Sequence, residues 1–312
     1  MVDIGAKLWK DGQILDAKEA SQVSLLTHTL HYGVGAFEGI RAYQRDDGHT
    51  YIFRLREHIV RLFDSCRLAT FEPQVSIDQV TEGCLQVLRE NGLNAAYLRP
   101  LVVLGAGAMG LLPTDNPPQT YVMAWEWGTY LGKDGLDKGI RCKISSFSRL
   151  HTNVNMTKGK LTGQYINSVM AKREAQMAGY DEALLLDVNG YVCEGSGENI
   201  FIVKGGRLYT PPASASILPG ITRDTIMTLA REDGLVVEEA MLTRDQLYLA
   251  DEVFLVGTAA EVTPVREVDN RPIGCLPSVS PVVGPVTKSL QARYFGLVRG
   301  ADESHPEWLT RV

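Results

Sequence analysis

The sequence predicts an α+β fold in two domains, because signals for tight hairpins and for helices recur in turn along the chain. Apolar runs flank the dipeptides Asp11-Gly12, Asp47-Gly48, Asn189-Gly190 and Gly205-Gly206, which favour hairpin turns. Other stretches repeat apolar residues at helical spacing. The length of 312 residues suits two ordinary domains. Since hairpins pair strands antiparallel, we do not expect a doubly wound parallel sheet.

The elements predicted in the first domain, residues 1–127, follow in the order of these signals. Hairpins are predicted at 8–15 and 40–53, helices at 55–66 and 76–91, and strands at 97–104 and 121–127. Leu55, Ile59 and Leu62 share one helical face. Ser76 and Gln79 resemble a capping box, the reciprocal pair of hydrogen bonds that begins a helix. Glycines and charges make residues 128–138 the predicted interdomain loop.

The second domain is predicted to span residues 139–312 and to mix the same kinds of element. It begins with a strand at 141–147 and a helix at 164–177, followed by the two hairpins that turn at Asn189-Gly190 and Gly205-Gly206. A further helix starts near Thr222 and stops at Gly234. The domain ends with a short apolar strand at 253–256 and a closing helix at 285–297.

The composition excludes several classes of partner. The formal net charge is −6 and no basic run is interleaved with aromatics, so we expect no nucleic-acid partner. No apolar stretch reaches the length of a membrane span, and the charged N-terminus does not resemble a signal peptide. His28 and His31 have H-x-x-H spacing but no acid or thiol at ligand spacing, so no metal site is predicted. The scattered cysteines fit reduced thiols of a cytoplasmic protein and lie at positions 66, 84, 142, 193 and 275.

A glycine-rich segment at 105–110, GAGAMG, matches the pattern G-x-G-x-x-G of dinucleotide-binding oxidoreductases. Pro113, Pro117 and Pro118 follow it closely. Prolines at these places oppose the helix whose N-terminus would bind a pyrophosphate. We therefore favour a loop near some other ligand, or a simple tight turn.

Two short segments suggest a site for an anionic cofactor. Residues 218–223 (LPGITR) open a helix that Thr222 is placed to cap, and Thr258 follows an apolar strand. A phosphate dianion is bound by backbone amides at a helix start, by hydroxyls and by a guanidinium. Arg61 is a candidate for the guanidinium. Taken singly, each of these features also fits a turn, a helix cap or a solvated charge.

Short motifs spread over residues 9–297 occur in one characteristic order. They are His31-Tyr32-Gly33, Phe37-Glu38-Gly39-Ile40-Arg41, 56–62 (REHIVRL), Tyr97-Leu98-Arg99-Pro100, Lys160 with Tyr165, Glu194-Gly195, 218–223 (LPGITR) and 257–261 (GTAAE). In this order they resemble the branched-chain aminotransferases, which are class IV (fold type IV) pyridoxal-phosphate (PLP) enzymes. The resemblance implies two domains, each with a β-sheet or barrel-like core and flanking helices, joined by a short interdomain loop.

The resemblance also implies the residues that bind PLP. Lys160 resembles the lysine that forms a Schiff base with the cofactor. Chemistry alone does not choose between Lys160 and Lys158, but the family lysine lies five residues before a tyrosine, here Tyr165. Glu194 matches the acid paired with the pyridine nitrogen, and Gln164 stands where many members have asparagine. The implied phosphate cup and ring contact comprise Arg61, Gly220, Ile221, Thr222, Thr258 and Leu218.

The implied substrates are the branched-chain L-amino acids leucine, isoleucine and valine, L-glutamate, and their 2-oxo acids, which exchange an amino group in a ping-pong cycle. One pocket must then accept both an aliphatic side chain and a carboxylate. Arg99, with the partner subunit's Tyr32, is expected to bind the distal carboxylate of glutamate. The backbone amides of Thr258 and Ala259 are expected to bind the α-carboxylate of the substrate. The other implied pocket residues are Phe37, Gly39, Arg41, Tyr97, Trp127 and Tyr130. Plain core packing is an equal alternative for Trp127.

Other activities of the same fold stay open at this point. A D-amino-acid or (R)-amine transaminase, or an aminodeoxychorismate lyase, would share the cofactor site but not the pocket. Tyr32, Phe37 and the segment at 97–100 favour the branched-chain group. Because the sites of this family borrow residues across a subunit interface, a homodimer or a larger homo-oligomer is implied.

Overall fold

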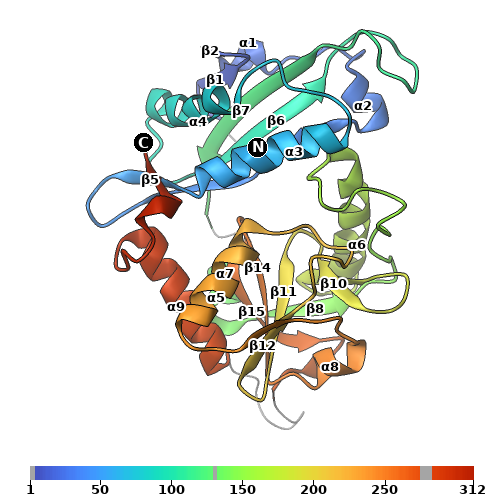
Figure 1. Ribbon diagram of the computed structural model, residues 1–312, viewed down its shortest axis with the longest axis vertical. Helices are drawn as coiled ribbons and strands as arrows, with labels where there is room; N and C mark the ends of the chain where they lie inside the picture. Colours follow the sequence, from blue (N-terminus) through green and yellow to red (C-terminus); the bar gives the residue numbers. More distant parts are fainter. Residues whose placement is uncertain (1–3, 129–131, 275–282) are drawn as a thin grey trace. The chain divides into compact units, whose positions relative to one another are not determined.

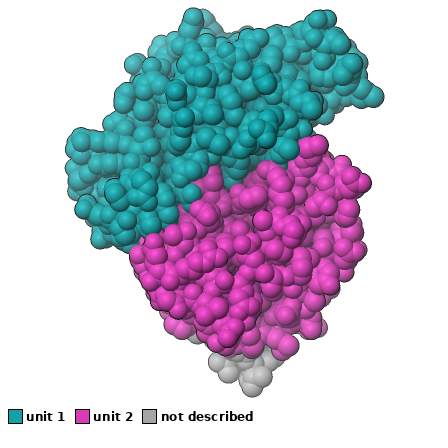
Figure 2. All heavy atoms as spheres, in the orientation of Figure 1, with its two compact units in different colours: residues 1–127, 159–165, 297–312 teal, residues 128–158, 166–296 magenta. Residues whose placement is uncertain are grey.

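The computed structural model describes residues 4–128, 132–274 and 283–312 (Figure 1). The chain forms two compact units (Figure 2). Unit 1 comprises residues 1–127, 159–165 and 297–312, and unit 2 comprises residues 128–158 and 166–296. Each unit is built on one sheet with flanking helices, which confirms the predicted α+β class.

The sheet of unit 1 has the strand order β17-β5-β4-β6-β7-β1-β2, with β3 paired to β6. All of its pairings are antiparallel. The hairpins predicted at 8–15 and 40–53 are confirmed. The bounds of the strands are β1 Lys7–Lys10, β2 Gln13–Asp16, β3 Gly35–Phe37, β4 Ile40–Gln44, β5 Thr50–Phe53, β6 Ala96–Leu104, β7 Pro118–Glu126 and β17 Leu309–Arg311.

Two long helices, α3 (Leu55–Leu68) and α4 (Ile77–Asn91), cover one face of this sheet (Figure 1). Their apolar faces bury Leu62, Val80 and Val87 in the core of the unit. The capping box of Ser76 and Gln79 is confirmed, and the left-handed Gly92 ends α4. The short helices of this unit are α1 Ala17–Ala20, α2 His28–Tyr32, η1 Thr162–Gln164 and η2 Pro306–Trp308.

The sheet of unit 2 closes on itself, since β10 pairs with both β9 and β11. The strand order is β10-β9-β8-β15-β14-β11-β12-β13, and β16 pairs with β15. The predicted hairpins β9–β10 and β11–β12 are confirmed, and the barrel-like core matches the expectation. The bounds are β8 Ile140–Ile144, β9 Glu182–Leu186, β10 Val192–Gly195, β11 Asn199–Lys204, β12 Arg207–Thr210, β13 Val237–Glu239, β14 Glu252–Gly257, β15 Glu261–Val268 and β16 Arg271–Pro272.

Helices of unit 2 pack against this closed sheet (Figure 1). The last three residues of α9, and the first of α6, count with unit 1. Among the residues that the structure describes, no helix combines the length and the apolar character needed to cross a membrane. The bounds are α5 Gly132–Lys138, α6 Tyr165–Met177, α7 Ile221–Glu232, α8 Arg244–Tyr248 and α9 Pro285–Arg299.

The division of the chain differs from the expected one in three places. Helix α5 lies within the segment 128–138 that was predicted to be a loop. Residues 159–165 belong to unit 1, where Leu161 bridges to Ala36 beside β3. Residues 297–312 also return to unit 1, because β17 pairs with β5. Such long-range pairings leave no local pattern in the sequence. The first segment of unit 1 ends after residue 127.

Candidate active site

Lys160 is held by its backbone between a strand and a helix of unit 1. Its carbonyl accepts a hydrogen bond from Phe37 N at 3.1 Å, and its amide donates to Ser65 Oγ at 2.9 Å. The side-chain amine donates to the hydroxyl of Tyr165 at 2.6 Å. Burial lowers the pKa of Lys160, but Tyr165 and Glu38 outweigh it, so that the pKa lies above its ordinary value. Lys160 and Tyr165, predicted to act together, therefore lie in contact.

Lys158, the other candidate lysine, has different surroundings in unit 2. Its amine donates to the carbonyl oxygens of Ala215 at 2.6 Å and Ile217 at 3.0 Å. Burial lowers the pKa of Lys158. The two lysines are thus distinguished by their partners. Lys158 is hydrogen-bonded to backbone carbonyls of a loop, whereas the amine of Lys160 contacts the hydroxyl of Tyr165 and lies over the rings of Phe37 and Tyr165.

Arg61 projects from α3 and is paired with a residue for which the sequence suggested no role. Its Nε and Nη2 donate to the two carboxylate oxygens of Glu38, at 2.7 and 2.9 Å. His58 Nδ1 lies 2.8 Å from the same carboxylate. Burial raises the pKa of Glu38, but Arg61 and His58 lower it far more, so that the carboxyl is ionised. The sequence signal for this cluster was an acid between two apolar segments, which form β3 and β4.

An arginine and four aromatic rings cluster in unit 1, and all of them except Trp125 are predicted pocket residues. The guanidinium of Arg99 lies 4.7 Å from the ring of Phe37 and 5.4 Å from that of Tyr97. The ring of Tyr97 packs against Trp125 and Trp127, at 5.1 and 5.0 Å between centroids. Trp127 is half-buried in this cluster. No carboxylate within the described ranges pairs with Arg99, and its Nε is buried without a partner there. No sequence signal singled out Trp125.

Gly39 and Arg41 lie beside Tyr97 as expected. A Cβ atom at Gly39 would stand 1.9 Å from the hydroxyl of Tyr97, so a larger residue would displace the phenol. Arg41 is the register partner of Tyr97 across β4 and β6 and stacks over Tyr43 at 5.2 Å. The predicted pocket residues Phe37, Gly39, Arg41, Tyr97, Arg99 and Trp127 are therefore neighbours.

Tyr32 lies on α2, where its hydroxyl donates to the carbonyl of Met109 at 2.7 Å. The neighbouring His28 and His31 rings are hydrogen-bonded to the carbonyls of Gly110 and Leu25. The glycine-rich segment 105–110 begins an irregular connection between β6 and β7 without a helix, so the dinucleotide pattern lacks its structural context. Tyr130 lies outside the described residues.

Glu194 is the penultimate residue of β10 in unit 2 and the centre of a buried network. Its carboxylate accepts hydrogen bonds from Arg149 Nε at 2.6 Å, from Asn199 Nδ2 at 3.1 Å and from Leu218 N at 3.0 Å. Asn199 also donates to the carbonyl of Leu218 at 2.9 Å. The network thus connects the acid to the segment that opens α7. The sequence did not single out Arg149, which lies 45 residues from its partner.

The start of α7 and the end of β14 carry the predicted anion-binding groups of unit 2. Gly220, not Thr222, is the N-cap of α7, and no side chain caps the helix there. A side chain at position 220 would collide with Asn199, whose Oδ1 would be 2.0 Å from the new Cβ. Ile221 and Thr222 form the first turn, whose amides are oriented along the helix axis. Thr258 and Ala259 directly follow β14 and are half-buried.

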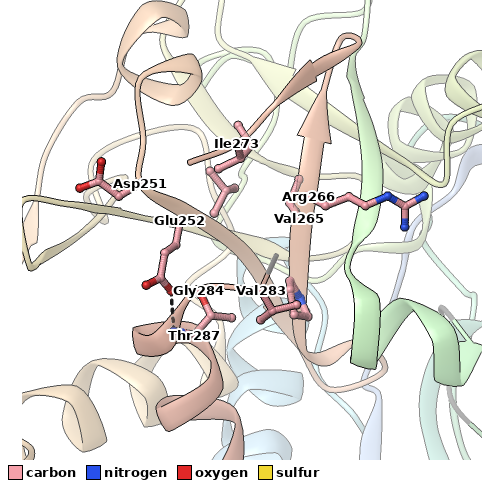
Figure 3. A pocket seen from close by; sticks show the side chains of 10 residues that line it. Asp251, Glu252, Val265, Arg266, Ile273, Val283, Gly284 and Thr287 are labelled. Carbon is pink, nitrogen blue, oxygen red and sulfur yellow. Dashed lines mark hydrogen bonds between the residues drawn. The ribbon is translucent and has the colours of Figure 1, made fainter. Parts of the chain in front are cut away.

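A separate pocket of unit 2 is lined by none of the predicted site residues (Figure 3). Its wall includes Glu252, whose carboxylate accepts hydrogen bonds from Val286 N, Thr287 N and Thr287 Oγ1. Val286 N and Thr287 N are the first two backbone amides of α9, because Pro285 has no N–H. The carboxylate therefore serves as a cap for that helix.

Comparisons with known proteins identify the family of the chain. The pattern of the Amino-transferase class IV family matches residues 35–268. A branched-chain-amino-acid aminotransferase of Pseudomonas aeruginosa is 49% identical over 312 residues, covering 100% of this chain and 99% of its own. A crystal structure of the Escherichia coli branched-chain amino acid aminotransferase superimposes with a TM-score of 0.93 at 44% identity, covering 98% of each chain. The Thermobaculum terrenum enzyme, crystallised in its PLP form, gives a TM-score of 0.90 at 34% identity over 98% of each chain.

Proposed function

The chain belongs to the class IV aminotransferases, and from this premise we propose that it transfers the amino group of branched-chain L-amino acids to 2-oxoglutarate with PLP as cofactor. The full-length similarity to branched-chain aminotransferases supports this choice over the D-amino-acid, (R)-amine and lyase activities. The site residues support it independently, because each chemical task of the reaction has a suitable side chain.

The residues present fit the cofactor. A phosphate dianion requires a guanidinium, hydroxyls and amides, which Arg61, Thr222, Thr258 and the uncapped first turn of α7 provide. The ring requires an acid for its nitrogen and an apolar contact, which Glu194 and Leu218 provide. Gly220 and Ile221 contribute backbone groups at the N-terminus of α7. When bound, PLP supplies an electron sink for the pair of electrons that the substrate's Cα–H bond releases.

Lys160 is the proposed point of covalent attachment and the proton carrier. Its amine, when displaced by the incoming amino acid, takes the proton from Cα of the substrate and later returns one. A base of this kind must be correctly aimed. The hydrogen bond to the hydroxyl of Tyr165 orients the amine. The hydrogen bonds of the Lys160 backbone to Phe37 N and Ser65 Oγ fix the position of the backbone from which the side chain extends.

Glu194 is proposed to keep a proton on the cofactor's ring nitrogen. An adjacent carboxylate stabilises the protonated, positively charged form of a pyridine. Arg149, Asn199 and the amide of Leu218 hold this carboxylate in one orientation. Orientation without reorganisation is the main protein contribution to such electrostatic catalysis.

The aromatic wall is proposed to accept both kinds of substrate side chain. Phe37, Tyr97 and Trp127 offer apolar faces to leucine, isoleucine or valine. Arg99 lies against two of these rings and pairs with no carboxylate of the described chain, so it suits the distal carboxylate of glutamate. Amides at Thr258 and Ala259 are assigned to the α-carboxylate.

The observation that carries the proposal is the short contact between the amine of Lys160 and the hydroxyl of Tyr165. Borohydride reduction of the purified protein followed by peptide mapping tests it, and we expect a pyridoxyl group on Lys160. A group on Lys158, or a colourless protein that takes up no added PLP, would overturn the assignment. Parallel assays of L-leucine, D-alanine and an (R)-amine with 2-oxoglutarate should give turnover with L-leucine.

We also propose a homo-oligomer in the cytoplasm. Apolar side chains exposed around α2 and the β6–β7 connection, among them Leu26, Leu30, Leu111 and Leu112, favour burial against a second copy that would present its Tyr32. Four cysteines are buried without disulfides, which suits a reducing compartment. Light scattering of a Leu111→Glu, Leu112→Glu variant should show a smaller particle than the parent. An unchanged mass would contradict this choice of interface.

A further inference from the structure

Glu38 is an ionised side chain at the centre of unit 1, and its environment is unusual for an acid. It is 0% exposed, and its two oxygens face four donors: Nε and Nη2 of Arg61, Nδ1 of His58 and the backbone amide of Gly39. Burial lowers the pKa of His58, so the ring is neutral and donates a single N–H. A buried carboxylate is tolerated only when paired in this way, and the cluster therefore has one well-defined arrangement.

The same turn of α3 connects Arg61 to the segment of Lys160. Ser65 Oγ donates to the carbonyl of Arg61 at 2.8 Å and accepts from the amide of Lys160 at 2.9 Å. The backbones of the proposed phosphate-binding cation and of the proposed covalent lysine are thus one side chain apart. The guanidinium itself, on a long flexible side chain, needs a further restraint to keep its direction.

We propose that Glu38 is a positioning residue that orients the guanidinium of Arg61 and so gives the protein its preference for a phosphorylated over an unphosphorylated aldehyde. A guanidinium has a planar fork of donors, and two bonds to one carboxylate fix the plane of that fork. The acid is fully buried while the Arg61 side chain is 15% exposed, so the cation is the member available to a ligand. This inference rests on the proposed function, because the anion is taken to be the phosphate of the cofactor.

The test compares PLP with pyridoxal, which has the same ring and aldehyde but no phosphate. Both are titrated into the apo form of the full chain, and the covalent adduct is followed by absorbance. The parent protein should prefer PLP. We expect Glu38→Gln to weaken PLP binding by about 10–100-fold, the loss associated with a misdirected charge-assisted hydrogen bond, and to leave pyridoxal binding unchanged.

The matched control is Glu57→Gln, also on α3, which removes a carboxylate paired with Arg54 at 2.7 Å and should alter neither affinity. If Glu38→Gln does not fold, His58→Phe removes one donor from the cluster and should lower the PLP preference in the same direction by a smaller factor. Equal losses for both aldehydes would mean a purely structural role and overturn the inference, as would an unchanged or tighter affinity for PLP. A parent protein that binds neither aldehyde would instead overturn the proposed function.

Discussion

Among the residues that the structure describes, each unit has one carboxylate–arginine pair in which both side chains are at most 15% exposed, and the two pairs are arranged differently. In unit 1 the acid, Glu38, is 0% exposed and the Arg61 side chain 15%. In unit 2 the side chains of Arg149 and Glu194 are 9% and 7% exposed, almost equal. Glu38 receives its other bonds from His58 and the amide of the adjacent Gly39, whereas Glu194 receives bonds from Asn199 and the amide of Leu218, 24 residues away. An arginine–carboxylate pair can thus hold the arginine in place, as in unit 1, or hold the carboxylate in place, as in unit 2.

The difference shows that the surroundings of a buried pair determine its use. We interpret Glu38 as a support for Arg61, because the buried member of a pair fixes the more accessible one. We interpret Arg149 as a support for Glu194, because two further donors hold the acid to the loop that opens α7. If this interpretation is correct, removing the acid of each pair must damage different properties.

The largest effect should come from Glu194→Gln. The amide keeps the shape but loses the negative charge that favours a protonated ring nitrogen, so transamination should slow on the order of 10²–10³-fold while PLP stays bound. Single-turnover absorbance and a PLP titration separate the two properties. Glu267→Gln, which disrupts the more exposed pair with Arg141, is the control and should leave turnover near the parent value. Near-normal turnover of Glu194→Gln would refute the role of the acid.

Arg149→Met should disrupt the Arg149–Glu194 pair by removing the arginine instead of the acid. An uncompensated buried carboxylate costs about 3–5 kcal/mol of unfolding free energy. Arg141→Met removes a partly exposed partner of Glu267 and should cost less than about 1 kcal/mol. Denaturant unfolding of the apo proteins measures both values.

Arg61→Met should instead abolish the preference for PLP over pyridoxal. A similar loss of this preference in Arg149→Met would contradict the proposed difference between the two pairs.

Arg99 is an arginine without an acid of its own in the described chain, and Arg99→Ala sharpens the comparison. We expect kcat/KM for glutamate to fall about 10–100-fold more than that for leucine, because only glutamate presents a second carboxylate. Steady-state kinetics with each substrate give the ratio. Arg45, which stacks over Tyr51 at 5.0 Å, offers the matched control, and Arg45→Ala should change both substrates alike. Equal losses for the two substrates in Arg99→Ala would count against the assignment.

Glu198 is a buried acid without a basic partner at ion-pair distance among the described residues, and its effect should be confined to the pH dependence of stability. Burial and the nearby Glu182 raise its pKa to about 8. The folded state then binds more protons than the unfolded state between roughly pH 4.3 and 8, so stability falls as pH rises through that window, by at most about 1.4 kcal/mol per pH unit. Glu198→Gln cannot ionise and should lack this decline when unfolding is measured at pH 5 and pH 8.

The control for this pH experiment is Glu174→Gln. Burial raises the pKa of Glu174, but hydrogen bonds from Ser145 and Ser146 outweigh it and keep the pKa below its usual value. This carboxyl is therefore ionised in both states above pH 5, and its replacement should shift stability equally at both pH values. Parallel pH profiles for the parent and Glu198→Gln would contradict the protonation assigned to Glu198.

Local patterns predicted the parts of the fold whose causes are local. The turns at Asp11-Gly12 and Gly205-Gly206 have positive φ at both residues, as two-residue hairpins require. Strand β15 escaped prediction because Pro264 and its charged residues do not resemble a strand, yet the sheet accommodates Pro264 opposite Phe254. Helix α5 escaped because its glycines and charges resemble a loop.

The sequence by itself determined the fold class, the hairpins, the long helices and the order of motifs that identified the candidate residues. Only the tertiary structure decided the partners of those residues: Glu38 with Arg61, Glu194 with Arg149, and the different surroundings of Lys158 and Lys160. The physical reason is distance along the chain. Turn and helix signals act over a few residues, whereas the two buried pairs span 23 and 45 residues and form only when strand register and helix packing bring them together.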